Sequence, residues 1–125
     1  MHNNSPSYVY EGGWKQDMRE GIGLLITKSY KYSGEFRNDK FEGEGIYCDS
    51  EGNIYQGDWV NGMRHGTAKL KCKNGDVFMG DFIKDRENGN GQVNYADGKF
   101  FNGIYLDGRR NGPGRMLFSK DQHGE

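Results

Sequence analysis

Side chains that could carry out catalysis or bind a metal are few in this chain, and they do not gather in its sequence. The cysteines are Cys48 and Cys72, and the histidines are His2, His65 and His123. None of them has the short paired spacing of a zinc site. Nothing in their spacing supports a Cys–His nucleophile pair. We therefore expect no metal, no cofactor and no catalytic residue, and we predict that the chain is not an enzyme.

Glycines and acidic pairs offer two further kinds of chemistry. Gly-x-Gly pairs such as Gly43/Gly45 resemble part of a phosphate-binding loop, but none has the Gly-x-Gly-x-x-Gly form between a strand and a helix. The acidic pair Glu42 and Glu44 is predicted to lie on exposed positions, where it would serve solubility. Neither pattern favours an active site.

Basic residues gather in one set of predicted turns and could meet anionic lipid headgroups. The candidate lipid-binding residues are Lys40, Arg64, Arg86, Arg109 and Arg110. Acidic residues share the same turns and offset much of this charge: Asp17, Glu20, Asp39, Glu42, Asp85, Glu87 and Asp107. A solvated turn therefore explains these residues better than a lipid site does.

Charge and composition exclude several protein classes. The formal net charge is -1, so the chain lacks the basic footprint of a nucleic-acid-binding domain. No apolar run suggests a signal peptide or a membrane-spanning helix. Two cysteines without a secretory signal favour an intracellular location. Glycine is abundant, at 21 residues, and aromatic residues make up 14%.

A repeat explains both excesses. Aromatic-x-Gly recurs at Tyr10, Tyr32, Tyr55, Phe78 and Phe101, at intervals of 22 or 23 residues. A second ring follows four residues later in each unit, at Trp14, Phe36, Trp59, Phe82 and Tyr105. A Gly-x-Gly or Gly-x-Ala pair then begins eleven residues after the first ring, as at Gly66 and Ala68. The glycines are therefore part of an architecture.

The spacing predicts strands. Aromatic-x-Gly-x-aromatic has period 2, so Tyr55, Gly57 and Trp59 share one face of a strand. Six residues with turn chemistry separate this strand from the next, which carries Gly66, Ala68 and Leu70 on the same face. We expect each unit to be a β-hairpin in which the three glycine columns, which include Gly57, Gly66 and Ala68, are sockets that let the rings lie flat. Cys48 and Cys72 fall in different columns and should lie on opposite faces.

This pattern resembles the MORN repeat (membrane occupation and recognition nexus). Tyr-x-Gly-x-Trp, then Asn-Gly-x-Arg-x-Gly, is best seen in "YQGDWVNGMRHGTAKLKCKNGD", and the departures are Ala68, "DRENG" and "TKSYK". The resemblance implies an elongated, single-layer antiparallel β-solenoid of about five hairpins over residues 8–118. The ending "GPG…QHGE" is similar to radial spoke head proteins of cilia. Residues 1–7 are expected to be a tail, and residues 119–125 the start of a truncated sixth repeat or a tail.

A single-layer sheet leaves one aromatic face without a covering layer, so we predict a partner-binding groove there. The candidate residues are the two ring columns: Tyr10, Trp14, Tyr32, Phe36, Tyr55, Trp59, Phe78, Phe82, Phe101 and Tyr105. The leading hypothesis is a scaffold that binds a helix or extended segment of another protein. The resemblance implies cytoskeletal, ciliary or membrane-associated assemblies in the cytoplasm or at its membrane face. The alternatives are a phosphoinositide-binding adaptor and the targeting region of a larger enzyme, such as a lipid kinase or methyltransferase. The edge strands could also mediate self-association.

Overall fold

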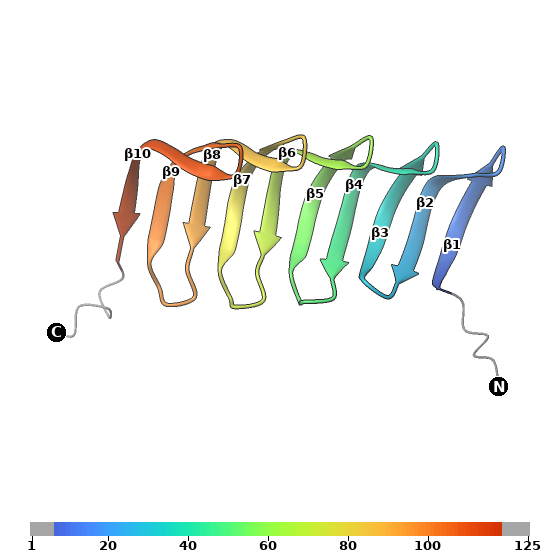
Figure 1. Cartoon of the computed structure of the whole chain (residues 1–125), viewed down its shortest axis with the longest axis horizontal. Helices are drawn as coiled ribbons and strands as arrows, with labels where there is room; N and C mark the ends of the chain where they lie inside the picture. Colours follow the sequence, from blue (N-terminus) through green and yellow to red (C-terminus); the bar gives the residue numbers. More distant parts are fainter. Residues whose placement is uncertain (1–6, 119–125) are drawn as a thin grey trace.

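Ten antiparallel strands form one open sheet in chain order (Figure 1). The computed structural model describes residues 7–118. The strands are β1 (Tyr8–Lys15), β2 (Met18–Thr27), β3 (Tyr30–Arg37), β4 (Lys40–Asp49), β5 (Ile54–Val60), β6 (Met63–Lys71), β7 (Val77–Ile83), β8 (Arg86–Asn94), β9 (Phe100–Leu106) and β10 (Arg109–Leu117). The predicted all-β hairpin solenoid is therefore confirmed. Among the described residues, no helix is long and apolar enough to cross a membrane.

Each pair of strands is closed by a tight turn, here called the first turn of its repeat. In repeat 3 the turn consists of Asn61 and Gly62, with φ values of 52° and 81°. Positive φ at both central residues identifies a type I′ hairpin, whose twist matches that of the strands it joins. The expected six-residue connection was wrong, because β5 and β6 continue to these two residues.

Every hairpin contains a register shift, and this changes the explanation for one glycine column. In repeat 3 the shift follows Gly57, and Gly66 on the opposing strand has φ +76°. A Cβ at Gly66 would meet only the Asp58 side chain, at 3.6 Å or more, and one at Gly21 would meet nothing within 4 Å. The prediction that this column is a ring socket was therefore wrong. Its glycines occupy a β-bulge position that needs a left-handed backbone.

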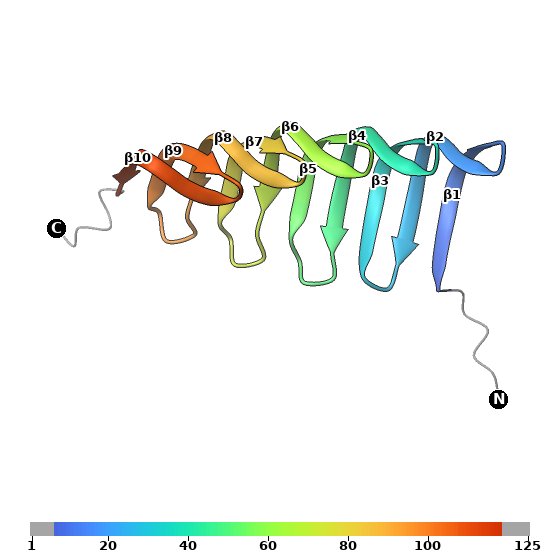
Figure 2. The ribbon, with the colours of Figure 1, turned by 45° about the horizontal axis from the view of Figure 1, so that its top comes forward.

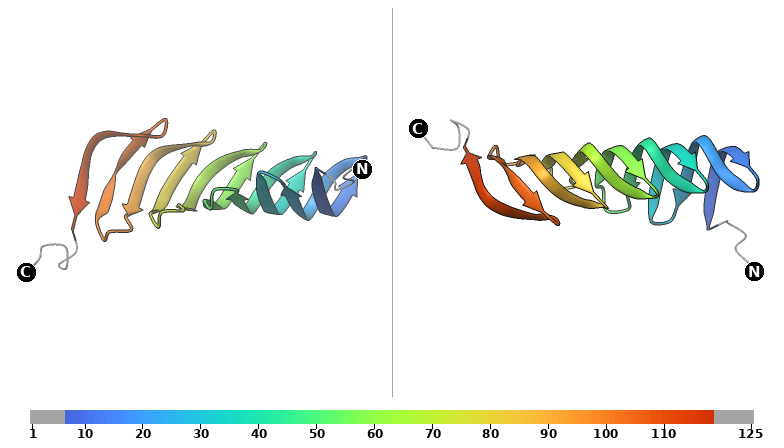
Figure 3. Two further views of the ribbon diagram at one scale, coloured as in Figure 1. Left: turned by 60° about the horizontal axis from the view of Figure 1, so that its bottom comes forward. Right: turned by 90° about the horizontal axis from the view of Figure 1, so that it is seen from above.

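The bulges bend the sheet into a trough. The part of each hairpin near its first turn leans over the rest, as the tilted view shows (Figure 2). Seen from above, these parts run diagonally across the long axis (Figure 3). The buried core lies along the inside of this bend and consists almost entirely of the two ring columns: Leu25, Tyr32, Phe36, Tyr55, Trp59, Ala68, Phe78, Phe82, Phe101 and Tyr105.

Candidate partner-binding surface

The two ring columns form a continuous ladder along the trough. The first ring of each repeat meets the second ring of the next repeat edge to face, for example Tyr32 with Trp59 at 5.7 Å and Tyr55 with Phe82 at 5.3 Å between centroids. Edge-to-face pairs are stabilising beyond the area that they bury. The ladder therefore joins neighbouring repeats.

The two remaining glycine columns, which contain Gly23 and Gly34, provide the sockets that the sequence predicted. A Cβ at Gly23 would lie 2.7 Å from the Tyr10 ring, and one at Gly34 would lie 2.6 Å from the Gly45 Cα atom. Each tyrosine ring lies along its strand over these glycines, and its hydroxyl donates to a backbone carbonyl three residues on. The Tyr55 hydroxyl reaches the Asp58 oxygen at 2.9 Å. Burial raises the pKa of Tyr55 to about 12, which keeps this donor protonated at neutral pH.

Eight of the ten ring residues predicted to bind a partner are buried against their own chain. The exceptions are in the first repeat, where Tyr10 is half-buried and Trp14 is 60% exposed. Their role in partner binding stays a prediction, because the ladder covers most of their area. Apart from Trp14, the accessible aromatic surface of the trough lies on other residues.

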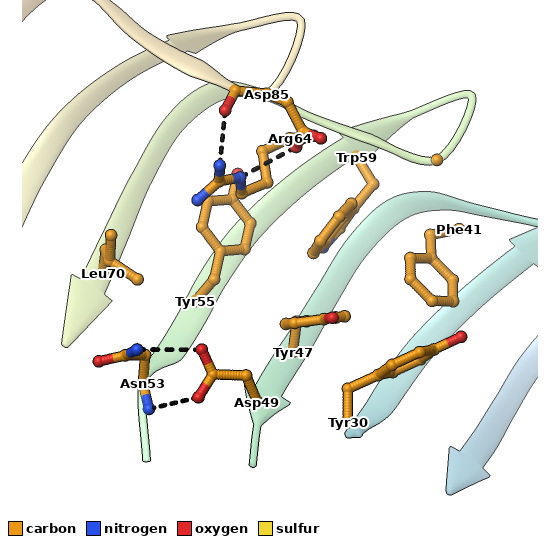
Figure 4. Close-up of a pocket in the computed structure, with 11 residues that line it drawn as sticks. Tyr30, Phe41, Tyr47, Asp49, Asn53, Tyr55, Trp59, Arg64, Leu70 and Asp85 are labelled. Atoms are coloured by element: carbon orange, nitrogen blue, oxygen red, sulfur yellow. Dashed lines mark hydrogen bonds and ion pairs between the residues drawn. The ribbon is translucent and has the colours of Figure 1, made fainter. Parts of the chain in front are cut away.

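Three additional rings surround a hollow in the trough at repeats 2 and 3. Tyr30, Phe41 and Tyr47 are half-buried and pack on the ladder. The Phe41 ring stacks on Tyr32 at 3.9 Å, and Tyr30 stacks on Tyr47 at 5.0 Å. Together with Trp59 they line a hollow of about 440 Å³ (Figure 4). Sequence reasoning missed these residues because they lie outside the two ring columns, although each differs visibly from its equivalent in repeat 3.

Polar groups close both ends of this hollow. Near the first turn, Arg64 donates from Nε to Asp85 at 2.9 Å. At the other end, the Asp49 carboxylate accepts from the Asn53 backbone and side-chain nitrogens, each at 3.0 Å. The hydrogen bonds from Asn53 hold the pKa of Asp49 below its usual value, so this end is anionic at neutral pH. Figure 4 shows the rings between these two polar ends.

The predicted lipid-binding residues differ in exposure and contacts, and their role in lipid binding stays a prediction. Arg64 is half-buried, and its guanidinium lies over Phe82 at 5.0 Å. Arg110 lies over Phe101 at 4.8 Å. Lys40, Arg86 and Arg109 are exposed. Arg19, which the sequence reading did not single out, is equivalent to Arg64 and pairs with Asp39 at 2.6 Å.

The remaining sequence-based candidates have structural roles. Glu42 is half-buried, and its carboxylate accepts from the Asn61 backbone nitrogen at 3.2 Å. The expectation that it only serves solubility was therefore wrong, because it ties repeat 2 to the first turn of repeat 3. Cys48 and Cys72 are free thiols. Within residues 7–118, no group of three potential metal ligands gathers.

Comparison with known proteins assigns the family. The MORN repeat matches residues 10–29, 32–54, 55–77, 78–100 and 101–122, which together cover most of the chain. The protein belongs to the MORN-repeat family. MORN repeats are generally non-catalytic modules and occur in protein-binding or membrane-associated proteins. The resemblance to radial spoke head proteins stays a prediction.

The curated relatives are far longer than this chain. Alsin from Rattus norvegicus is 28% identical over 69 residues, and Alsin from Homo sapiens is 26% identical over the same length. In both cases the match covers 50% of this chain and 4% of the relative. The chain therefore spans only a small part of the length of these relatives.

Proposed function

We propose that this chain is a non-enzymatic scaffold that binds a helix or extended segment of another protein in the trough, centred on the hollow at repeats 2 and 3. The observation that carries the proposal is the group of half-buried rings Tyr30, Phe41 and Tyr47 on a sheet without a second layer. Partly exposed aromatic side chains in a concave site are typical anchors for a partner.

The polar ends of the hollow define the partner's expected chemistry. An apolar or aromatic side chain would contact the rings, and a lysine or arginine beside it would face the ionised Asp49 carboxylate. The Arg64 guanidinium is already neutralised by Asp85, so that end does not favour an anionic ligand. The proposed partner segment is therefore apolar with a basic flank.

Neighbouring repeats provide a matched test. Repeat 3 carries Asn53, Arg64 and Leu70 where repeat 2 carries Tyr30, Phe41 and Tyr47. A variant with Tyr30→Asn, Phe41→Arg and Tyr47→Leu thus places residues that the same backbone already accepts one repeat along. Gly62→Asp would supply the new arginine with the partner that Asp85 gives Arg64. We expect a folded sheet by circular dichroism.

The experiment compares wild type and this variant as baits, followed by titration of the partner identified with wild type by mass spectrometry. We expect the variant to lose affinity at least about tenfold, as removal of an aromatic anchor does. Lys40→Glu with Arg86→Glu, on exposed positions, is the control and should change affinity by only a few-fold. Equal binding by wild type and the ring variant would refute the assignment of the hollow.

The competing proposal is an adaptor for anionic lipid. Exposed Lys40, Arg86 and Arg109 give it some support, and liposome co-sedimentation tests it directly. Lipid binding would weaken steeply with ionic strength, by about 1 kcal/mol per lost basic residue. Binding in the trough would depend on ring area and only weakly on salt.

Two further proposals concern the setting of the chain. The first is a cytoskeletal, ciliary or membrane-associated location, which localisation of the protein would test. The second is that the chain is the targeting region of a larger enzyme, which the full gene would test.

A further inference from the structure

Every junction between repeats has the same three contacts. A glycine or alanine on the even-numbered strand faces a glycine on the next strand, as Gly45 faces Gly57. The second ring of the following repeat packs on the first ring of the preceding one, as Trp59 does on Tyr32. A backbone nitrogen in the following first turn also donates to the preceding repeat, as from Gly62 to the Phe41 oxygen at 3.0 Å.

Side chains at the third contact follow a rule. Where the preceding repeat has arginine, the following turn has aspartate: Arg19 with Asp39, and Arg64 with Asp85. In both pairs the arginine Nε and backbone nitrogen donate to the same carboxylate oxygen, at 2.6 to 3.1 Å. We call this contact the Arg–Asp clasp. The other two junctions have no arginine at this place, and their turns have glycine, at Gly62 and Gly108.

The two ends of the sheet carry complementary halves of such a junction. Arg110 on β10 occupies the arginine position and lies over the Phe101 ring. Asp17 in the first turn of repeat 1 occupies the aspartate position, with φ +64°. Among the described residues, neither side chain takes part in an ion pair, although each end holds the group that the other lacks. Arg110 of one copy and Asp17 of another could therefore form one Arg–Asp clasp.

The ring contact is also divided between the two ends. Trp14 is 60% exposed, whereas its equivalents Phe36, Trp59, Phe82 and Tyr105 are 0–8% exposed. In those repeats the preceding repeat covers the ring, and β1 has no preceding strand in the described sheet. Phe101 is the ring on which such a residue would pack, because its equivalent Phe78 packs on Tyr105 at 5.2 Å.

The backbone of β10 is suited to this pairing. Gly114 and Gly112 are equivalent to the two β2 glycines that face Gly34 and Phe36 across the first junction. They would therefore face Gly12 and Trp14 of β1 in an added copy. Pro113 lacks an N–H, but at the equivalent place the Glu44 nitrogen donates within its own hairpin, to the Glu35 side chain. The proline therefore removes no donor from the outer edge.

We propose that a second copy of this chain adds its β1 to β10, head to tail, and closes an Arg110–Asp17 clasp over Phe101 and Trp14. The contact is antiparallel edge-strand addition, with backbone hydrogen bonds for affinity and the clasp and ring for register. Because the two surfaces differ, the contact is heterologous and each added copy presents a new edge. This contact between copies does not require a partner segment in the trough.

Sedimentation velocity of the full chain over a wide concentration range tests this proposal. We expect the weight-average mass to rise with concentration for wild type. Arg110→Asp and Asp17→Lys should each lower the association constant at least about tenfold, because like charges then meet at the clasp. Arg109→Asp makes the same charge change beside the clasp and should associate as wild type does. Circular dichroism checks folding, and Asp17→Asn removes the charge while tolerating positive φ.

The decisive measurement is a mixture of the two single variants. Each keeps one intact edge, and these edges are complementary, so the mixture should associate although neither variant does alone. A chain carrying both changes should also regain association. A wild type that stays monomeric throughout would overturn the proposal. So would a loss caused by Arg110→Asp but not by Asp17→Lys, because this indicates a tail-to-tail contact.

Discussion

The junction between repeats 2 and 3 and the one between repeats 3 and 4 share a backbone, and they differ in the group that lies over the ring pair. In the first, the Phe41 ring lies between Tyr32 and Trp59, at 3.9 and 5.2 Å. In the second, the Arg64 guanidinium lies between Tyr55 and Phe82, at 5.7 and 5.0 Å. The same place over a ring pair therefore accepts either flat group.

The choice between the two groups decides which side chains the trough exposes. The guanidinium is held by Asp85, so the junction between repeats 3 and 4 is clasped and polar. Phe41 faces Gly62, which supplies no carboxylate, so the junction between repeats 2 and 3 exposes apolar rings beside the hollow. Repeating positions thus form the sheet, while varied positions such as Phe41 and Arg64 separate a clasped junction from one with exposed rings.

The largest expected effect concerns the socket at each junction. Gly45 and Ala68 occupy the same column, but Tyr32 is stacked beneath Phe41, and a Cβ at Gly45 would run into the Tyr32 ring. We expect Gly45→Ala to lower the free energy of unfolding by about 2 kcal/mol through overpacking. Ala68→Gly should cost about 1 kcal/mol or less. Urea unfolding measures both, and equal effects would show that the two sockets do not differ.

A smaller effect should follow from converting one junction into the other. Phe41→Arg alone loses the stacked ring and places a guanidinium beside Gly62 without a carboxylate. Phe41→Arg with Gly62→Asp rebuilds the clasp, at a turn position where Asp39 and Asp85 already have φ of 70° and 74°. A double-mutant cycle should give a favourable coupling of about 1 kcal/mol. Additive effects of the two changes would mean that the clasp contributes nothing in this setting.

The sequence was sufficient for the repeat, the strands, the faces and the ring sockets, because period 2 and a fixed interval determine them. It was insufficient for the second glycine column. A glycine needed for positive φ and a glycine needed for space look alike in a sequence, and only the open surroundings of Gly21 separate them. The first turns were predicted at the right residues but too long, because β5 and β6 continue up to Asn61 and Gly62.

The candidate site was less predictable than the fold. Ring residues in the columns were the obvious choice, but regular repetition allows neighbouring repeats to cover them, and Tyr32 is fully buried as a result. The accessible rings Tyr30, Phe41 and Tyr47 depart from their columns. A residue that differs from its equivalents points to a site only once the repeating residues are known to form the core. The register of the sheet was needed to establish this.

Repeats also differ in whether the stabilising contribution of their first ring depends on pH. Repeats 1 to 3 have tyrosine as the first ring, and repeats 4 and 5 have Phe78 and Phe101. Because burial raises the pKa of Tyr55 from 10.0 to about 12, the folded state holds this proton more tightly than the unfolded state does. Its contribution is complete below pH 10 and is lost as the pH rises toward about 12.

Tyr55→Phe isolates this contribution. At neutral pH it should cost about 1 kcal/mol for the lost hydrogen bond to the Asp58 oxygen. Between pH 10 and about 12 the variant should lose less stability than wild type, because one raised tyrosine pKa is gone. Urea unfolding across this range measures the difference. Parallel pH curves for the two proteins would show that Tyr55 does not titrate in this way.

The smallest effect is expected at the far end of the same two junctions, where Asp49 and Cys72 occupy equivalent positions. Hydrogen bonds from Asn53 lower the pKa of Asp49, whereas burial raises the pKa of the Cys72 thiol. Cys72→Ser with Cys48→Ser should change the free energy of unfolding by less than about 0.5 kcal/mol, as changes away from packed cores do. The raised pKa leaves little thiolate at neutral pH, so Cys72 should react with iodoacetamide more slowly in the folded protein than in urea. Mass spectrometry of the modified peptides follows both cysteines, and an equal or faster rate for folded Cys72 would show that this end of the trough is open to solvent.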